Sequence, residues 1–250
     1  MLNITDHGRV RELRIDRPPA NALNGELLRT LQSSLDTAAA EADAVVVSGR
    51  PGMFSAGLDV PELLGLERAD FTGLWQEFIG LQRTIATLPT PIAFALTGHA
   101  LAGGVLLAVY GDYRVMPRGP YKTGLNEVKI GLVVPETPFW ALRRLVGSEV
   151  AAELVLGGEM IASERAAAIG LVDELVDSPE AAVAAAVAWC ERHLTLPRDA
   201  MLATRAMARS DLHALFEGEN AAHGDRFIDF WFSEDTQRRL RALVASLGKR

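Results

Sequence analysis

Two glycine-containing turns carry the residues best suited to chemistry. One is Ser55-Ala-Gly-Leu-Asp59 and the other is Leu101-Ala-Gly-Gly104. Each lies between a predicted strand and a predicted helix, where backbone N–H groups are free and the positive end of the helix dipole lies. Because glycine leaves no side chain in the way, a negative oxygen can approach these amides closely. Two such turns can each supply one N–H group to a single oxyanion. A glycine pair before a helix is equally common as a packing feature, so that alternative stays open.

Strands and helices alternate along the part of the chain that must position these turns. The apolar run 91–96 predicts a buried strand, and the apolar residues 105–110 predict a buried helix after the glycine pair. The other predictions are an edge strand at 9–15, a helix at 25–41 capped by Asn24, a strand at 44–47, a helix at 71–87 and a strand at 112–116. This alternation indicates an α/β fold with parallel strands.

The second half of the chain is predicted to be mostly helical. Residues 121–127 are predicted as a loop, and after Pro135 one strand-like segment at 171–176 interrupts the helices. Ser178 is expected to cap an alanine-rich helix that contains Cys190, which is interpreted as a small packed residue. Near the C-terminus, an aromatic cluster is expected to pack on the core or on a partner subunit; its members are Phe227, Phe230, Trp231 and Phe232.

The composition narrows the class of protein. The chain has 250 residues, is 49% hydrophobic and carries a net charge of −7, which disfavours a main role in nucleic-acid binding. A single cysteine excludes an internal disulfide and fits a reducing compartment. The N-terminal residues lack the pattern of a signal peptide, and no stretch reaches the length of a membrane span. We therefore expect a cytoplasmic protein with no membrane or nucleic-acid partner.

Several common motifs are missing. Gly104 stands where a P-loop needs its lysine, and no G-x-G-x-x-G sequence follows a strand. Ser55 lacks the first glycine of a nucleophile elbow, and His99 has apolar neighbours that favour a packing or hydrogen-bonding role. No H-E-x-x-H sequence or cysteine pair is present, so no metal site is expected.

Four segments resemble the crotonase (enoyl-CoA hydratase/isomerase) superfamily. They are the opening loop Arg17-Pro-x-x-Asn-Ala-Leu23, Phe54-Ser-Ala-Gly-Leu-Asp59, the turn Gly98-x4-Gly103-Gly104 and Asp112-Tyr-Arg. The resemblance implies an α/β spiral of β-β-α repeats, which we place at residues 1–195. It also implies a helical C-terminal region, here 196–250, that builds trimers, often paired into hexamers. The implied substrates are acyl-CoA thioesters, and coenzyme A would then be part of the substrate, with no further cofactor.

The resemblance also assigns the site residues. The oxyanion would be held by the N–H groups of Leu58 and Gly103. The coenzyme A and acyl path would be lined by residues of the first turn and by Gly103; the first-turn residues are Ala56, Gly57, Leu58, Asp59 and Val60. The helix at 71–87 would cover the acyl pocket. From the residues alone, Asp59 is better explained as a helix cap.

One departure from the family pattern bears on the reaction. Hydratases of this family place one glutamate just after the glycine turn and a second about twenty residues later, and together they activate water. Here Leu106 occupies the first position, whereas Glu127 matches the second. One carboxylate can move a proton from C2 to C4 of a 3-enoyl thioester, but water addition needs a second group. The sequence is most similar to the mitochondrial-type Δ3,Δ2-enoyl-CoA isomerases, which share this pattern.

Other possibilities remain open at this point. A hydratase, a C–C cleavage enzyme or a thioester hydrolase could use Glu127 with another group, and a catalytically silent acyl-CoA-binding or RNA-binding member belongs to a different class. Arg17, Lys122 and Lys129 are candidates for the coenzyme A phosphates, although a solvated surface is the default for such side chains. An apolar setting would raise the proton affinity of Glu127, and Leu106, Val134 and Trp140 are candidates to provide it.

Overall fold

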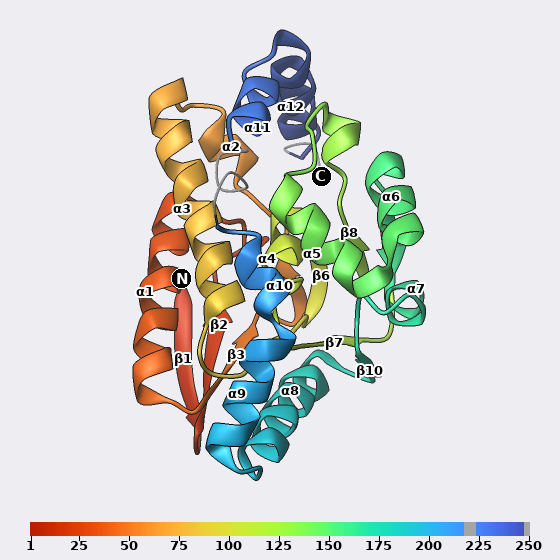
Figure 1. The fold of residues 1–250 in the computed structure, drawn as a ribbon. Helices are drawn as coiled ribbons and strands as arrows, with labels where there is room; N and C mark the ends of the chain where they lie inside the picture. Colours follow the sequence, from red (N-terminus) through yellow and green to blue (C-terminus); the bar gives the residue numbers. More distant parts are fainter. Residues whose placement is uncertain (218–223, 248–250) are drawn as a thin grey trace.

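The computed structural model describes residues 1–217 and 224–247 (Figure 1). A six-stranded sheet has the order β1-β2-β3-β5-β7-β10, and a four-stranded sheet has the order β4-β6-β8-β9. The larger sheet consists of β1 (Leu2–His7), β2 (Val10–Ile15), β3 (Ala44–Ser48), β5 (Ile92–Ala95), β7 (Tyr113–Pro117) and β10 (Glu174–Val176). The smaller consists of β4 (Gly52–Ser55), β6 (Gly98–Leu101), β8 (Lys122–Gly124) and β9 (Met160–Ala162). All neighbouring strands are parallel except the pairs β1–β2 and β8–β9.

Successive chain segments repeat one path through the two sheets. The pairs β3–β4, β5–β6 and β7–β8 each place their first strand in the larger sheet and their second in the smaller. The helices that follow these pairs are α2 (Val60–Leu63) with α3 (Arg68–Thr87), then α4 (Gly103–Ala108), then the short 3-10 helix η1 (Glu127–Ile130) with α5 (Glu136–Val146). The expected spiral of β-β-α repeats is therefore confirmed.

The larger sheet is covered on both faces. Val45 and Val47 of β3 join the main core with α1 (Gly25–Glu41) and α3, whereas Ala44 and Val46 pack towards α8 (Pro179–Leu194). This alternation explains why every residue of β3 is buried. Cys190 of α8 lies in the second layer, where burial raises the pKa of its thiol to about 12. Its predicted role as a packed residue agrees with this position.

Local sequence signals explain several helix boundaries. The Asn24 side chain accepts a hydrogen bond from the Leu27 amide and caps α1 as predicted, and Ser178 caps α8 through the Ala181 amide. The remaining helices are α6 (Ser148–Gly157), α7 (Ser163–Ala168), α9 (Arg198–Ala208), α10 (Ser210–Ala214), α11 (Gly224–Trp231) and α12 (Glu234–Leu247). The predicted division between residues 195 and 196 stays a prediction, and residues 218–223 and 248–250 of the C-terminal region lie outside the described structure.

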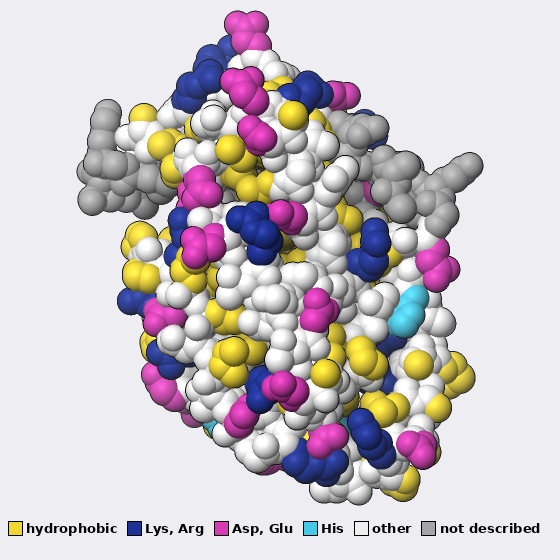
Figure 2. All heavy atoms as spheres, turned by 90° about the vertical axis from the view of Figure 1, so that its left-hand side faces the viewer, with side chains coloured by type: hydrophobic (Ala, Val, Ile, Leu, Met, Phe, Trp, Pro, Cys, Tyr) yellow, Lys and Arg dark blue, Asp and Glu magenta, His cyan; other side chains and the backbone are white. Residues whose placement is uncertain are grey.

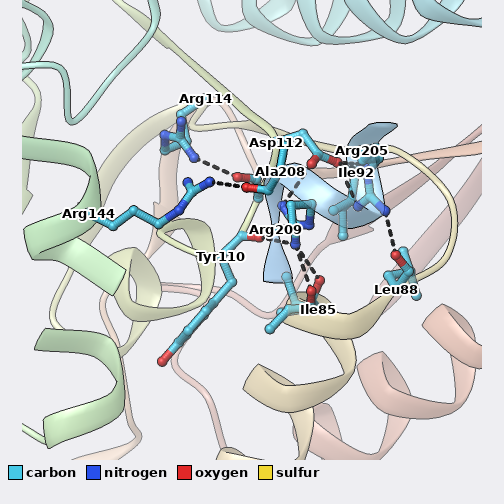
Figure 3. Close-up of polar contacts among 12 residues, drawn as sticks. Ile85, Leu88, Ile92, Tyr110, Asp112, Arg114, Arg144, Arg205, Ala208 and Arg209 are labelled. Atoms are coloured by element: carbon cyan, nitrogen blue, oxygen red, sulfur yellow. Dashed lines mark hydrogen bonds and ion pairs between the residues drawn. The ribbon is translucent and has the colours of Figure 1, made fainter. Parts of the chain in front are cut away.

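A cluster of buried charges fixes α9 and α10 to the core (Figure 3). Asp112 accepts hydrogen bonds from Arg205 at 2.9 Å and from Arg209 at 2.7 Å. Arg209 also donates to the carbonyls of Ile85, Ala86 and Tyr110, near the ends of α3 and α4. A cation is favourable at these helix C-termini because the dipole is negative there. Arg209 is 4% exposed, and burial lowers the pKa of its guanidinium to about 10, against the opposing effect of Asp112.

The predicted aromatic cluster packs mainly on α3 of the same chain. Trp231 stacks on Phe71 with ring centroids 4.5 Å apart, and Phe232 meets the same ring edge-on. Phe227 stacks on Trp75, and the two ring centroids lie 3.9 Å apart. Phe230 is the exception, at 41% exposed. These contacts place α11 beside α3, as Figure 1 shows.

Two kinds of strand prediction are wrong. The strand at 9–15 is not at the edge, because β1 pairs with β2 through the turn at Gly8 and takes the edge position. The predicted loop at 121–127 contains β8, and the strands β4, β6 and β9 were not predicted. Each of these strands has three or four residues, which is too short for an alternating pattern to be visible.

The side of the molecule formed by α1 and α3 has a mixed surface (Figure 2). Basic and acidic side chains are interspersed there, and Arg29 of α1 pairs with Glu77 of α3 at 2.9 Å. Both partners are substantially exposed, so this pair adds little stability. In the part of the chain that the structure describes, no helix combines the length and apolar character that crossing a bilayer requires.

Candidate active site

Three neighbouring strands of the smaller sheet have their carboxyl ends on the same side of it. The order β4-β6-β8 is parallel, so the segments after these strands emerge side by side. Leu58 follows β4, Gly103 follows β6 and Glu127 follows β8. The carboxyl ends of parallel strands are where ligands commonly bind in α/β folds. The topology therefore brings the two predicted amides and the predicted carboxylate to one place.

The first turn is held so that the Leu58 amide stays available. The Leu23 amide donates to the Gly57 carbonyl at 2.8 Å, and the Asp59 amide donates to the Leu23 carbonyl at 3.0 Å. These two bonds form a parallel bridge between Leu23 and Leu58, which leaves the Leu58 N–H on the opposite side of the chain. Ser55 supports the same turn, because its hydroxyl accepts from the Gly57 amide and donates to the Asn21 carbonyl.

Asn21 anchors the opening loop beneath this turn and was not identified from the sequence. Its backbone has φ of +49°, a conformation that asparagine tolerates better than most residues. Its buried side-chain amide donates to the carbonyls of Ile15, Met53 and Phe54, and its oxygen accepts from the Arg17 amide. An asparagine after two prolines is a turn signal that could have indicated this role.

The second turn brings the Gly103 amide close to the Leu58 amide. A Cβ atom on Gly103 would lie 3.2 Å from the Leu58 nitrogen, and one on Gly57 would lie 2.9 Å from the Gly103 nitrogen. Gly103 is the first residue of α4, so its N–H has no partner within the helix. Among residues 1–217 and 224–247, neither amide donates to an acceptor. Two free N–H groups this close together are suited to hold a single negative oxygen, so the predicted use of these amides as an oxyanion hole is compatible with the geometry and stays a prediction.

Ala102 precedes this pair in an unusual conformation. Its φ of 46° and ψ of −122° lie in a region that favours glycine. Alanine at this position therefore places a methyl group on a strained backbone. This methyl lies 3.1 Å from where a Cβ of Gly57 would be, so Ala102 packs between the two turns.

A mostly apolar cavity of about 100 Å³ adjoins the Leu58 and Gly103 turns. The turns contribute Ala56, Leu58, Ala102 and Gly103, and the segment after β8 contributes Asn126 and Glu127. The apolar lining consists of Val60, Trp75, Phe78, Leu106, Ile130, Leu132, Pro135, Phe227, Trp231 and Leu243. Trp75 and Phe78 belong to α3, so the predicted covering helix does border this space. Glu127 is the single titratable side chain among the described lining residues.

The environment of Glu127 changes its acid strength. The residue is 5% exposed, and burial raises the pKa of its carboxyl to about 7, while a contact with its own backbone amide lowers it in smaller measure. Its Oε2 atom is buried and has no hydrogen-bond partner within the described chain. A carboxyl with a pKa near neutrality can both accept and return a proton.

The structure separates the predicted lining residues into two groups. Ala56, Leu58, Val60 and Gly103 border the cavity, whereas Gly57 and Asp59 are not among its described lining residues. Gly57 packs against the second turn, where a Cβ atom on it would lie 2.9 Å from the Gly103 nitrogen. The Asp59 side chain caps α2 through the Glu62 amide, as the capping interpretation expected, and it also pairs with Arg17 at 2.6 Å.

The residues predicted to provide an apolar setting for Glu127 lie in different places. Leu106 lines the cavity with Glu127, but Trp140 is 43% exposed and lies beneath the guanidinium of Arg143. His99 has the expected hydrogen-bonding role, since its Nδ1 accepts from the Lys122 amide at 3.1 Å. No set of three His, Cys, Asp or Glu side chains among the described residues is arranged to hold a metal ion.

Three residues are candidates to bind the coenzyme A phosphates, and two of them, Lys122 and Lys129, have exposed side chains. Arg17, in contrast, is engaged by Asp59 and lies 3.5 Å from the Glu62 carboxylate. A phosphate would have to compete with these carboxylates for Arg17, whereas the two lysines are accessible from solvent. A role of the three residues in binding coenzyme A stays a prediction.

Comparison with known proteins places the chain in a family. The family model described as enoyl-CoA hydratase/isomerase matches residues 5–241. A protein of Mycobacterium avium (strain 104) named "Probable enoyl-CoA hydratase echA17" is 35% identical over 219 residues, covering 86% of this chain and 83% of the relative. The human "Enoyl-CoA delta isomerase 1, mitochondrial" is 28% identical over 248 residues, covering 95% and 80%.

The fold comparison agrees with the sequence comparison. The crystal structure of human mitochondrial Δ3,Δ2-enoyl-CoA isomerase superposes with a TM-score of 0.92 at 27% identity, covering 99% of this chain and 98% of that one. The similarity extends over nearly the whole of both chains and includes the helical C-terminal region. With its spiral of β-β-α repeats and paired amide turns, this chain belongs to the enoyl-CoA hydratase/isomerase family, within the crotonase superfamily.

Proposed function

We propose that this protein is a Δ3,Δ2-enoyl-CoA isomerase, which moves a double bond from C3 to C2 of an acyl-CoA thioester. The observation that carries the proposal is that Glu127 and Leu106 line the same cavity, in which Glu127 is the single titratable side chain of the described lining. By the family resemblance, Leu106 stands where hydratases carry the other glutamate that activates water. This arrangement supports a reaction that needs one acid–base group.

The geometry supports a proton shuttle. The thioester oxygen would accept hydrogen bonds from the Leu58 and Gly103 amides. The Glu127 carboxylate would take a proton from C2, and the C–H electron pair would become the C1–C2 double bond of a dienolate. The negative charge would then lie on the thioester oxygen, where the two amides stabilise it. Return of the same proton from Glu127 to C4 would give the conjugated 2-enoyl thioester, with no other reactant consumed.

Hydration is the second candidate, because relatives such as the 35% identical mycobacterial protein carry the name of hydratases. Adding water across a 2-enoyl thioester requires one group to deprotonate the water and a proton donor for C2. Glu127 can supply one of these functions, and Leu106 cannot supply the other. The lining therefore favours isomerisation over hydration.

A product screen tests the choice between the two reactions. Purified protein is mixed in separate reactions with 3-hexenoyl-CoA and 2-hexenoyl-CoA, and the conjugated and 3-hydroxy thioesters are quantified by chromatography. We expect conjugation of the first substrate and little hydroxy product from either. Glu127→Gln should lose at least about 100-fold in rate. The exposed carboxylate of Glu159 provides the matched control Glu159→Gln, which should retain the parent activity. Hydration faster than isomerisation would contradict the proposal.

We further propose that the enzyme is cytoplasmic, acts without a separate cofactor and assembles as a trimer or a pair of trimers. Exposed apolar side chains in the C-terminal half support assembly: Leu196 is 49% exposed and Met207 of α9 is 72% exposed. Light scattering on the purified protein measures the oligomeric state, and a monomer at micromolar concentration would contradict this part of the proposal.

A further inference from the structure

Four aromatic side chains form one wall of the active-site cavity. Trp75 and Phe78 come from α3, and Phe227 and Trp231 come from α11. We call this set the aromatic wall. Trp75 and Phe227 stack nearly parallel, with an interplanar angle of 7° and ring centroids 3.9 Å apart. Their exposed fractions are 2% and 4%, so both rings are buried.

Contacts outside the cavity hold the aromatic wall in place. Trp231 stacks on Phe71, which is fully buried in α3. The Trp231 carbonyl accepts a hydrogen bond from the Gln237 side chain at 3.0 Å, which ties the end of α11 to α12. Arg68 of α3 also pairs with Asp229 of α11 at 2.8 Å. A ligand that extends past the wall must therefore separate α11 from α3, and must break the stacked rings to do so.

The volume of the cavity limits how much acyl chain fits in front of the wall. A protein cavity of about 150 Å³ holds a benzene molecule, which corresponds to about 25 Å³ for each carbon. The cavity of about 100 Å³ thus has room for about four carbons. In the proposed reaction the thioester carbonyl would lie at the Leu58 and Gly103 amides, which border this space.

Given the acyl-CoA isomerase function proposed above, on which this step rests, we propose that the aromatic wall selects short substrates. The accepted acyl chains have about four to six carbons in total. Trp75 and Phe227 are the specificity-determining residues, because their stacked rings occupy the space that a longer chain would need. Removing one ring of this stack opens the wall without touching Glu127 or the oxyanion hole.

Binding of unreactive ligands tests this inference separately from catalysis. Butanoyl-, hexanoyl-, octanoyl-, decanoyl- and dodecanoyl-CoA are saturated and have no double bond to move. Their dissociation constants are measured by titration calorimetry. Each methylene that enters an apolar space should improve binding by about fourfold. For the parent protein we expect improvement up to about hexanoyl-CoA, followed by no further gain or a loss.

Phe227→Ala should extend the improvement to decanoyl-CoA, because the chain can occupy the space of the lost ring. Phe227→Leu keeps most of the apolar volume and is the alternative should the alanine variant fail to fold; it should shift the limit by a smaller amount in the same direction. Trp189→Leu is the matched control. Trp189 also stacks on an aromatic ring, Tyr113, with centroids 5.3 Å apart, but it belongs to α8 and does not line the cavity. The chain-length profile of Trp189→Leu should equal that of the parent.

The outcomes separate this inference from the proposed function. Affinity that rises steadily to dodecanoyl-CoA in the parent protein, together with isomerisation of 3-hexenoyl-CoA, would overturn the chain-length limit and leave the isomerase in place. The same would follow if both Phe227 variants kept the parent profile. Failure of every acyl-CoA to bind would overturn the proposed function itself, and the chain-length limit with it.

Discussion

Replacing Glu127 by glutamine should stabilise the folded protein at high pH while it removes activity. The carboxyl is buried in the cavity, and its pKa rises from an ordinary 4.5 to about 7. Because one pKa unit corresponds to about 1.4 kcal/mol, this difference amounts to about 3 kcal/mol between the two protonation states. Glutamine has nearly the same shape as the protonated acid but never carries the charge.

The sign of the effect follows from the direction of the shift. Between pH 4.5 and about pH 7, the folded protein holds a proton on Glu127 that the unfolded chain has already released. The free energy of unfolding of the parent therefore falls as pH rises through this interval. Below 4.5 the carboxyl is neutral in both states, so glutamine should give little gain there. Above about 7 the gain should reach its full value of about 3 kcal/mol.

Urea denaturation at about pH 4, pH 6 and pH 8 measures this difference between the parent and Glu127→Gln. The exposed Glu159→Gln variant reports any general effect of removing a surface carboxylate. A stability gain that stays constant over the three pH values would show that the Glu127 carboxyl is not shifted. Destabilisation by glutamine at about pH 8 would refute the idea that a buried charge is held at this position.

The active site gives two further predictions, and the buried charge cluster around Arg209 gives a third. The isomerisation rate should rise with pH and level off above about 7, because the reaction begins with the Glu127 carboxylate; a rate profile measures this, and a rate that falls over the same interval would oppose it. Gly103→Ala should fold, since alanine suits a helix start, but should lose about 100-fold in kcat because its methyl would lie 3.2 Å from the Leu58 amide; unchanged kcat would argue against the oxyanion hole. Arg209→Met should lower the free energy of unfolding by about 3 kcal/mol, since it leaves Asp112 and three carbonyls short of a partner; a urea midpoint equal to that of the parent would contradict this.

Much of the larger sheet and its helices could be predicted from local sequence patterns. The strand at 44–47 and the helix at 25–41 have apolar spacing and a capping residue that act within a few positions. The smaller sheet could not be predicted in this way, because β8 has only the residues Lys-Thr-Gly and is defined by its neighbours. Its role is nevertheless central, since β4, β6 and β8 bring the site together.

The residues of the site differ in how far the sequence could predict them. The Leu58 and Gly103 amides and Glu127 were found through motif spacing and family resemblance, and the structure places them beside one cavity. Asn21 was missed because its role depends on carbonyls of Met53 and Phe54, more than thirty residues away. The aromatic wall was missed for the same reason. Phe227 was recognised as a packing residue, but its stacking on Trp75 depends on contacts far apart in the sequence.

The fate of a deuterium label tests the one-glutamate proton shuttle most directly. 3-Hexenoyl-CoA deuterated at C2 is converted by the parent protein, and the product is analysed by mass spectrometry and NMR at the earliest times sampled. We expect 2-hexenoyl-CoA that carries deuterium at C4, and no such product from Glu127→Gln. 3-Hydroxyhexanoyl-CoA as the main product, or a Glu127→Gln variant as active as the parent, would contradict the one-glutamate shuttle.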